Sequence, residues 1–287
     1  MNRHPYFDLY LHDDEELGDL LGSPVVQRQT LQEWPLSCVQ RLTTSAGRKR
    51  IYKAQHEPTV EPEFYEQAHS CLLVPARTIY RAGVYSAMLF DEIDAPTLEK
   101  LNLSESQALE AGRSLLQQIA EIEGELPYYL DICTEQKWYA RMGLVLSDLE
   151  GLVEAGIFKS VHLEDLARLE RWAFCTGVLA TFQAGTGTVH NDLAGDNVFM
   201  LPDGPRVIDW QRPILGPAHL DLALLLESLG FDPLSYVGEG IVRLMRLLRI
   251  GWLTECAVKW FPEGRETYDR QIARLALGNA KDIRENI

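Results

Sequence analysis

The sequence predicts an α+β fold with two lobes, a small β-rich lobe at the N-terminus and a larger helical lobe at the C-terminus. Up to about residue 95, short runs rich in β-branched and aromatic residues alternate with turn residues. From about residue 103 onward, apolar residues recur at the helical spacings of three and four. We therefore expect an N-terminal lobe over residues 1–92 and a C-terminal lobe over residues 93–287.

The individual elements follow from these patterns in order. The N-terminal part is expected to hold one helix and a set of strands, at VVQRQTL, SCVQRLTT, KRIYKAQ, RTIYRAG and VYSAMLF. Next, LSESQALEAGRSLLQQIAEIEG predicts a helix because Ser104 and Gln107 form a capping box at its start. A second helix is expected over LEDLARLERWAFCTGVLATFQAG, ending near Gly185, and the chain from Ala218 onward is expected to be helical again.

Composition limits the classes of partner. The 287 residues carry a formal net charge of −15 without a basic block, so nucleic acid is not an expected partner. Neither a secretory signal nor an apolar stretch of membrane-spanning length is visible, so we expect a cytoplasmic protein with no membrane partner. The five cysteines are isolated in sequence, which indicates buried thiols in a reducing compartment.

A hairpin is predicted at VFMLPDGPRVIDW, because the Pro-Asp-Gly turn folds the chain back on itself. We expect Val198–Leu201 to pair with Arg206–Asp209. Asn197 and Asp209 would then lie at the same open end of the hairpin, beside the loop that holds Asp192. Two carboxylates and an amide oxygen would converge there.

This set of side chains suits Mg²⁺, which prefers oxygen ligands and is usually held by one or two carboxylates together with substrate phosphates. Phosphoryl transfer requires little else from a protein than charge neutralisation and an acceptor hydroxyl held near a base. We expect Asp192 to accept the proton of that hydroxyl, and Asn197 and Asp209 to hold the metal.

The pattern H-x-D-x-x-x-x-N followed by I-D-W resembles the signature of kinase-like phosphotransferases. The chain resembles the aminoglycoside phosphotransferase and choline kinase superfamily, with HNDLAGDN at His190–Asn197 and IDW at 208–210. The H-N-D variant is similar to choline kinases, whereas IDW with the later Gly216 and Asp221 is similar to the aminoglycoside branch, so both branches stay open. The resemblance implies a protein-kinase-like fold, Mg²⁺, and ATP or GTP as the phosphoryl donor to the hydroxyl of a small molecule.

Nucleotide-binding residues follow from the same resemblance. Lys53 matches the lysine that contacts the α- and β-phosphates, and the pattern E-x-x-F-Y selects Glu61 as its partner, with Glu63 and Glu66 close enough to compete. The segment at 89–93 is similar to the hinge that reads the nucleotide base. It contributes the candidates Phe90, Glu92 and Ile93.

The phosphate-covering loop is expected near Gln32–Ser37, and this segment departs from the family because it contains no glycine. Ser37 is its candidate phosphate contact. We expect His190 to be a packed residue that orients the loop rather than a base. Asp221 by resemblance caps the amides of the catalytic loop, and Asp196 either faces solvent or adds a metal or substrate contact.

The acceptor is suggested by charge alone. From Asp91 to Glu135 the chain is rich in Asp and Glu, with only Lys100 and Arg113 as basic residues. A negative rim favours a cationic acceptor such as an aminoglycoside, an amino sugar or an amino alcohol; the alternative is a solvated helix face. A catalytically silent nucleotide-binding or regulatory protein on the same fold is the alternative function. The sequence decides neither between ATP and GTP nor the oligomeric state.

Overall fold

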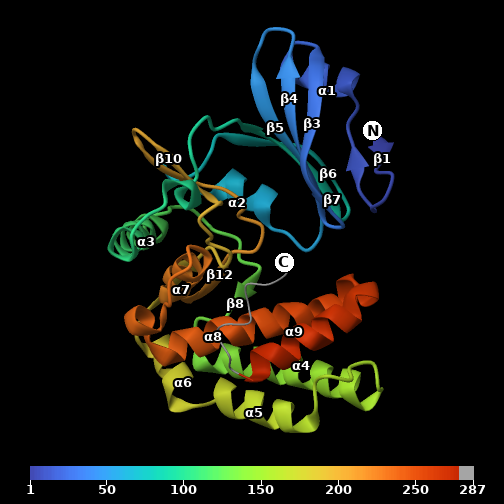
Figure 1. Ribbon diagram of the computed structural model, residues 1–287. Coiled ribbons are helices and arrows are strands. Elements are labelled where there is room, and N and C mark those ends of the chain that lie inside the picture. The colour runs from blue at the N-terminus through green and yellow to red at the C-terminus, as the bar shows by residue number, and fades with distance from the viewer. Residues whose placement is uncertain (278–287) are drawn as a thin grey trace. The chain divides into compact units, whose positions relative to one another are not determined.

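The structure is a computed structural model that describes residues 1–277 (Figure 1). Its contacts define two compact units. Unit 1 comprises Met1–Leu130 and His190–Ile214, and unit 2 comprises Asp131–Val189 together with the chain from Leu215. All the residues expected to bind nucleotide or metal, or to act as the base, lie in unit 1.

A five-stranded antiparallel sheet forms the centre of unit 1, in the order β3-β4-β5-β7-β6. The runs that were expected to be strands are confirmed. Their bounds are β3 (Val25–Trp34), β4 (Ser37–Thr44), β5 (Lys49–His56), β6 (Ala76–Ala82) and β7 (Tyr85–Asp91).

The two faces of this sheet bury different apolar clusters, because side chains alternate along a strand. Leu42 and Tyr52 belong to a cluster that includes helix α1 (Asp14–Leu21), and we call this side the outer face. Phe90 belongs to the cluster on the opposite side, which we call the inner face. Lys53 follows Tyr52 along β5 and therefore lies on the inner face.

Two helices belong to the first 95 residues, so the expectation of one is wrong. The additional helix is α1, which starts with a reciprocal capping box between Asp13 and Glu16 and ends at Gly22 with φ of 65°. These are ordinary start and stop signals that the sequence carried. The other helix is α2 (Glu61–Gln67), whose first turn contains Pro62.

The helix expected after Ser104 is confirmed as α3 (Glu105–Ala120), with the predicted capping box to Gln107. Unit 1 also contains β1 (Asn2–Arg3) paired with β2 (Tyr10–Leu11), and the short helical turn η1 (Leu98–Leu101).

The expected hairpin is present, but its turn is tighter than predicted. β10 (Val198–Leu201) pairs with β11 (Gly204–Val207), so the expected pairing with residues 206–209 is wrong. Gly204 has φ of 124°, which glycine adopts readily, and this closes the turn early. Asn197 still lies at the open end beside Asp209, because the Ile208 N–H donates to the Asn197 carbonyl at 3.0 Å.

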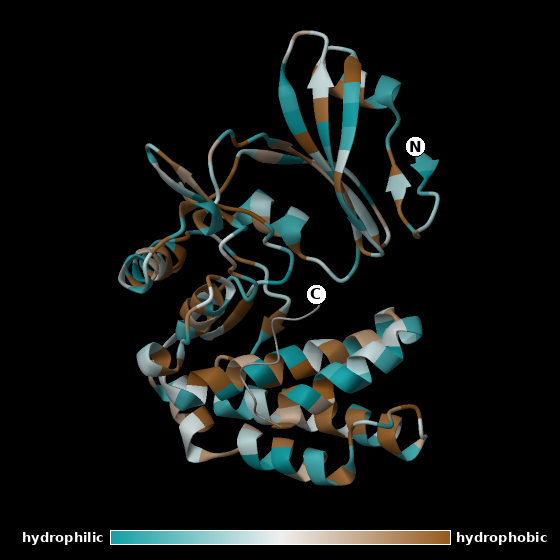
Figure 2. Ribbon diagram, viewed as in Figure 1, coloured by the Kyte–Doolittle hydropathy of each residue, from teal (hydrophilic) through white to brown (hydrophobic). Residues whose placement is uncertain are grey.

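Unit 2 is mainly helical, and hydrophobic residues recur along its helices (Figure 2). A small sheet of order β8-β12-β9 accompanies them. The strands are β8 (Leu130–Asp131), β9 (Thr186–Val189) and β12 (Ile214–Pro217). The helices are α4 (Glu135–Glu154), α5 (Leu163–Ala173), α6 (Thr176–Gln183), α7 (His219–Ser228), α8 (Leu234–Glu255) and α9 (Arg265–Leu277), with the turns η2 (Cys256–Trp260) and η3 (Pro262–Gly264).

The single helix expected from residue 163 to about 185 is wrong, because the chain breaks into α5 and α6. Cys175 takes an extended conformation and caps α6, while the ring of Phe174 stacks on Tyr139 at 4.6 Å between centroids. A tertiary contact thus overrides a continuous helical pattern. Within residues 1–277 no helix combines the length and apolarity that a membrane crossing needs, and the five cysteines are free thiols.

Candidate active site

Lys53 joins two carboxylates from distant parts of unit 1. Its Nζ lies 2.6 Å from Glu61 Oε2 and 2.6 Å from Asp209 Oδ1. Lys53 and Glu61 are buried, whereas the Asp209 side chain is 33% exposed. The other candidate partners are excluded, because Glu63 and Glu66 both pair with Arg81.

The charges of this triad depend on one another. Burial alone would lower the pKa of Lys53, but the two neighbouring carboxylates raise it. Burial raises the pKa of Glu61, and the nearby Lys53 offsets this only in part. Burial would also raise the pKa of Asp209, yet the charge and hydrogen bond of Lys53 hold it below its ordinary value. The site therefore keeps Asp209 ionised beside an ammonium group.

Asp209 has φ of 70°, a left-handed conformation that is uncommon for a residue with a side chain. The residues that follow fix this bend. The Trp210 ring stacks on Phe64 of α2 at 4.5 Å between centroids, and its indole N–H donates to the Val207 carbonyl. The Val60 N–H, just before α2, donates to the Gln211 carbonyl at 2.9 Å. The segment after β11 thus places Asp209 and the start of α2 together.

His190 holds the loop His190–Asn197, as expected. Its Nε2 lies 2.9 Å from the Ile208 carbonyl oxygen, which can only accept, so Nε2 carries the proton. Its Nδ1 accepts the Asp192 backbone N–H at 3.3 Å. Both ring nitrogens are engaged with the backbone, and His190 is 1% exposed. The imidazole is therefore a scaffold rather than a base.

Asp192 has a solvent-exposed side chain at the bend of this loop, after Asn191 with φ of 68°. Loss of hydration among the surrounding protein atoms raises the pKa of Asp192, and the charge of Asp209 raises it further. Asn197 donates its amide N–H to the Asp192 carbonyl at 3.0 Å. That bond uses the nitrogen and directs the amide oxygen elsewhere.

The donor set fits a hard divalent cation. Asp209 binds Lys53 through Oδ1, which leaves Oδ2 for a metal, and Asn197 offers its amide oxygen. An ionised carboxylate and an amide oxygen match the oxygen ligands that Mg²⁺ takes beside phosphates. Asp196 is exposed, which is the first of the two placements expected for it.

A pocket on the inner face connects this polar cluster to the segment after β7. Seven of the nine expected site residues line it: Lys53, Glu61, Phe90, Glu92, Ile93, Asn197 and Asp209. Asp192 and Ser37 do not. Its apolar walls are Leu31, Val39, Ile51, Val74, Phe90, Ile93, Phe199 and Ile208. A pocket with apolar walls and a cluster of charged groups suits a planar aromatic ring that carries an anionic group.

Sequence reasoning missed Arg41, which also lines the pocket. Its Nε donates to Glu92, whose carboxylate also lies 4.0 Å from the Lys49 ammonium. The neighbouring Asp91 pairs with Arg50 at 3.2 Å. Strand alternation was the available signal, because Arg41 shares the inner face with Lys53 once β4 and β5 are paired.

Ser37 begins β4 and is 3% exposed. Its hydroxyl oxygen accepts the Trp34 indole N–H at 2.6 Å. The structure therefore assigns this hydroxyl a partner within its own hairpin, and only the hydroxyl proton is left to donate.

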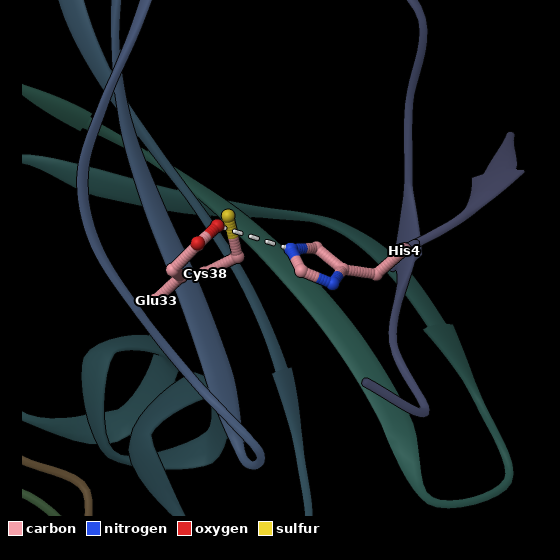
Figure 3. Close-up of side chains that lie close together, drawn as sticks. All are labelled: His4, Glu33 and Cys38. Carbon is pink, nitrogen blue, oxygen red and sulfur yellow. Dashed lines mark hydrogen bonds and ion pairs between the residues drawn. The ribbon is translucent and has the colours of Figure 1, made fainter. Parts of the chain in front are cut away.

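A second cluster of candidate metal ligands, His4, Glu33 and Cys38, lies on the outer face of the same hairpin (Figure 3). His4 Nδ1 accepts the N–H groups of Tyr6 and Phe7, both at 3.2 Å, so Nε2 carries the proton and faces Glu33 at 3.3 Å. Burial and then the Glu33 charge raise the pKa of Cys38 to about 11. A metal ion would have to displace the protons of His4 Nε2 and the Cys38 thiol, and the contact that the structure shows in this cluster is the hydrogen bond between His4 and Glu33.

Comparison with known proteins agrees with this geometry. No curated relative matches the sequence. Solved structures do, among them a thermostable mutant of aminoglycoside phosphotransferase APH(4)-Ia in its apo form, with a TM-score of 0.59 and 11% identity over 96% of this chain and 100% of that chain. A choline/ethanolamine kinase family protein from Mesorhizobium loti matches with a TM-score of 0.60 and 12% identity over 91% of this chain and 88% of that chain.

A third structure is the GDP and kanamycin complex of APH(2")-IIia, with a TM-score of 0.59 and 11% identity over 89% of this chain and 94% of that chain. These likenesses confirm the expected α+β, protein-kinase-like fold. The description "Phosphotransferase enzyme family" belongs to a family model that matches residues 29–246, most of the sequence. This chain belongs to the phosphotransferase enzyme family.

Proposed function

We propose that this protein is a Mg²⁺-dependent small-molecule kinase that transfers the γ-phosphoryl group of ATP or GTP to a hydroxyl of a small acceptor. The observation that supports this most directly is the Lys53 ammonium held between Glu61 and Asp209 at the end of an apolar pocket. Family membership supports phosphotransferase chemistry, and the GDP in the APH(2")-IIia complex supports a nucleotide as the donor.

Each residue has a role that its surroundings support. Lys53 is proposed to bind the α- and β-phosphates, with Glu61 keeping the ammonium in place. Phe90, Glu92 and Ile93 are proposed to contact the base, and Ser37 remains the candidate phosphate contact of the hairpin. Asn197 and Asp209 would hold Mg²⁺, which would supply positive charge to offset that of the phosphates.

Asp192 is proposed as the base. The acceptor oxygen forms a bond to the γ-phosphorus while the bond from that phosphorus to the β-γ bridging oxygen breaks, and the nucleoside diphosphate leaves. The acceptor's proton passes to the Asp192 carboxylate. Its raised pKa makes it a better proton acceptor than an ordinary aspartate.

Two observations bear on the class of acceptor. Kanamycin accompanies GDP in one similar structure, and the acid-rich segment from Asp91 to Glu135 favours a cation. Two of these acids are already neutralised, because Asp91 pairs with Arg50 and Glu92 pairs with Arg41. We propose an amine-bearing acceptor, such as an aminoglycoside, an amino sugar or an amino alcohol, and a cytoplasmic location.

The test has two stages. Calorimetric titration of the full chain with ATP and with GTP, each with and without Mg²⁺, is expected to show metal-dependent binding. Release of ADP or GDP is then measured with aminoglycosides, amino sugars, amino alcohols and matched neutral sugars. An acceptor-dependent rate that disappears in Asp192→Ala supports the proposal. Neither binding nor turnover in the unmodified protein would point instead to a silent member of the family.

A further inference from the structure

The tip of the β3–β4 hairpin, Trp34–Ser37, stands where the family resemblance implies a phosphate-covering loop, yet it lacks glycine. Trp34 lies opposite Ser37 and donates its indole N–H to the Ser37 hydroxyl at 2.6 Å. The His56 N–H donates to the Leu36 carbonyl at 2.8 Å. A tip built this way holds its own shape and offers fewer donors to a phosphate than a glycine loop would.

The N-terminal segment supports this hairpin from the outer face. Figure 3 shows His4 directed at Glu33 and Cys38, and the ring nitrogen donates to Glu33 at 3.3 Å. Glu33 and Trp34 are consecutive on β3, so their side chains point to opposite faces. While Glu33 is held on the outer face, Trp34 is turned toward the inner face.

Arg212 meets Trp34 on that inner face. Its guanidinium carbon lies 6.0 Å from the centroid of the Trp34 ring, within the range of a cation–π contact. Against the burial that raises the pKa of both Asp192 and Asp209, the charge of Arg212 acts to lower each of them. The backbone of Arg212 also contacts the loop that holds Asp192, because its carbonyl accepts the Asn191 side-chain N–H at 3.5 Å.

The backbone that carries Arg212 is fixed by the contacts that place Asp209. Trp210 stacks on Phe64, and the Gln211 carbonyl accepts the Val60 N–H. Arg212 follows Gln211 directly, so the position of its backbone is fixed. The contact with the Trp34 ring then positions its guanidinium group.

We propose that Arg212 binds the β- and γ-phosphates of the nucleotide, and that Trp34 is the positioning residue that holds the guanidinium beneath the hairpin tip. This inference rests on the proposed function. The single charge of Lys53 faces two carboxylates, Glu61 and Asp209, so a triphosphate tail needs a further cation beside it. In a glycine loop, backbone amides donate hydrogen bonds to the phosphates, and here the side chain of Arg212, held by Trp34, would donate them instead.

The test compares dissociation constants for ATP and AMP, both with Mg²⁺, on the full chain. Arg212→Met is expected to weaken ATP binding about 10- to 100-fold, the loss of a charged hydrogen bond. Trp34→Leu is expected to weaken it about 3- to 30-fold, and Trp34→Phe to restore most of that loss. AMP, which lacks both distal phosphates, is expected to change by no more than about twofold.

Arg28→Met is the matched control. Arg28 lies over the Tyr52 ring at 5.5 Å on the outer face of the same sheet, so its removal deletes the same kind of pair away from the phosphates. It is expected to leave the ratio of ATP to AMP affinity unchanged. In the double variant, Trp34→Leu is expected to add nothing to Arg212→Met.

Equal weakening of ATP and AMP in Arg212→Met and Trp34→Leu would overturn the inference, because it would show a structural role for the hairpin alone. So would an unchanged ATP affinity in Arg212→Met. If Trp34→Leu does not fold, the comparison of Arg212→Met with Arg28→Met still shows whether ATP binding weakens more than AMP binding. An unmodified protein that transfers phosphoryl groups from ATP to an acceptor shows that the proposed function survives either result, whereas one that binds no nucleotide overturns both proposals.

Discussion

Two acidic side chains, Asp209 in unit 1 and Asp269 in unit 2, have pKa values below the ordinary value of an aspartate, and the groups that lower the pKa differ between them. Burial would raise each of them. Asp269 is 4% exposed and accepts the backbone N–H groups of Lys159, Ser160 and Val161 at 2.8 to 3.0 Å. Asp209 instead has the Lys53 ammonium, and its side chain is one-third exposed.

The difference separates a structural carboxylate from one that can change partners. Backbone N–H groups cannot leave without unfolding the turn that carries them, so Asp269 fastens the chain before α5 to helix α9. A lysine side chain can turn toward a phosphate, so the contact between Lys53 and Asp209 Oδ1 can be lost at small structural cost. A carboxylate whose charge is held by a side chain is thus the better candidate for function.

Asp192 extends this comparison, because within residues 1–277 its carboxylate has neither a lysine nor a set of backbone N–H groups as a hydrogen-bond partner. Asp192→Ala is expected to lower the rate of transfer about 10²- to 10⁴-fold, the usual contribution of a positioned base. Its dissociation constant for nucleotide is expected to stay near that of the unmodified protein. Single-turnover kinetics and calorimetry separate the two quantities. Parallel loss of binding and transfer would contradict the assigned role.

Asp209→Asn and Asp269→Asn set the two carboxylates directly against each other. Mutating even the outer partners of a metal ligand costs about 10- to 100-fold in affinity or activity, so Asp209→Asn is expected to lose at least that factor in Mg²⁺-dependent ATP binding. Lys53 keeps Glu61, so thermal unfolding should change little.

Asp269→Asn is expected to show the reverse. An amide oxygen cannot replace two carboxylate oxygens facing several N–H donors, so the free energy of unfolding should fall by about 3 kcal/mol. Nucleotide affinity below the unfolding temperature should be unchanged. A stable Asp269→Asn protein together with an unstable Asp209→Asn protein would reverse our assignment of roles.

The local part of the site was predictable because its geometry is encoded by short spacings. His190–Asn197 and Asp209 flank one hairpin, so their convergence followed from a turn signal. The register of that hairpin was not predictable to the residue. Pro205 was expected to lie in the turn, yet it pairs with Met200, because the return strand begins at Gly204, two residues earlier than predicted.

The rest of the site depends on contacts between segments far apart in sequence. Arg41 meets Glu92, and Trp34 meets Arg212, only after β3, β4 and β7 have taken their places in the sheet. A lone arginine in a strand carries no local mark of such a partner. The break between α5 and α6 was missed for the same reason. The helical periodicity of the sequence continues through Phe174, and it gives no sign that this ring packs on Tyr139.

Glu61→Gln tests how much the buried half of the Lys53 triad contributes. Gln keeps the size of the side chain but cannot hold an ammonium by charge, so kcat/KM for ATP is expected to fall about tenfold, as for a lost charged hydrogen bond. Glu63→Gln is the control on the same helix, because Glu63 pairs with Arg81. Its kcat/KM should stay within about twofold. Equal losses in both variants would indicate damage to α2 rather than to the triad.

The smallest expected effect is the pH dependence of the Asp269 contact. Because the pKa of folded Asp269 lies below 3.8, the stabilisation is complete above pH 3.8 and is lost as the pH falls through the folded-state value. The difference in unfolding free energy between the unmodified protein and Asp269→Asn, measured in urea, should therefore shrink as the pH falls below 3.8. The control is Lys159→Met, which removes the ammonium group but leaves the backbone N–H of residue 159 in place. When both proteins carry Lys159→Met, the difference in unfolding free energy caused by Asp269→Asn should stay the same. If the difference becomes smaller, the Lys159 ammonium rather than the backbone stabilises this carboxylate, and Asp269 would resemble Asp209 after all.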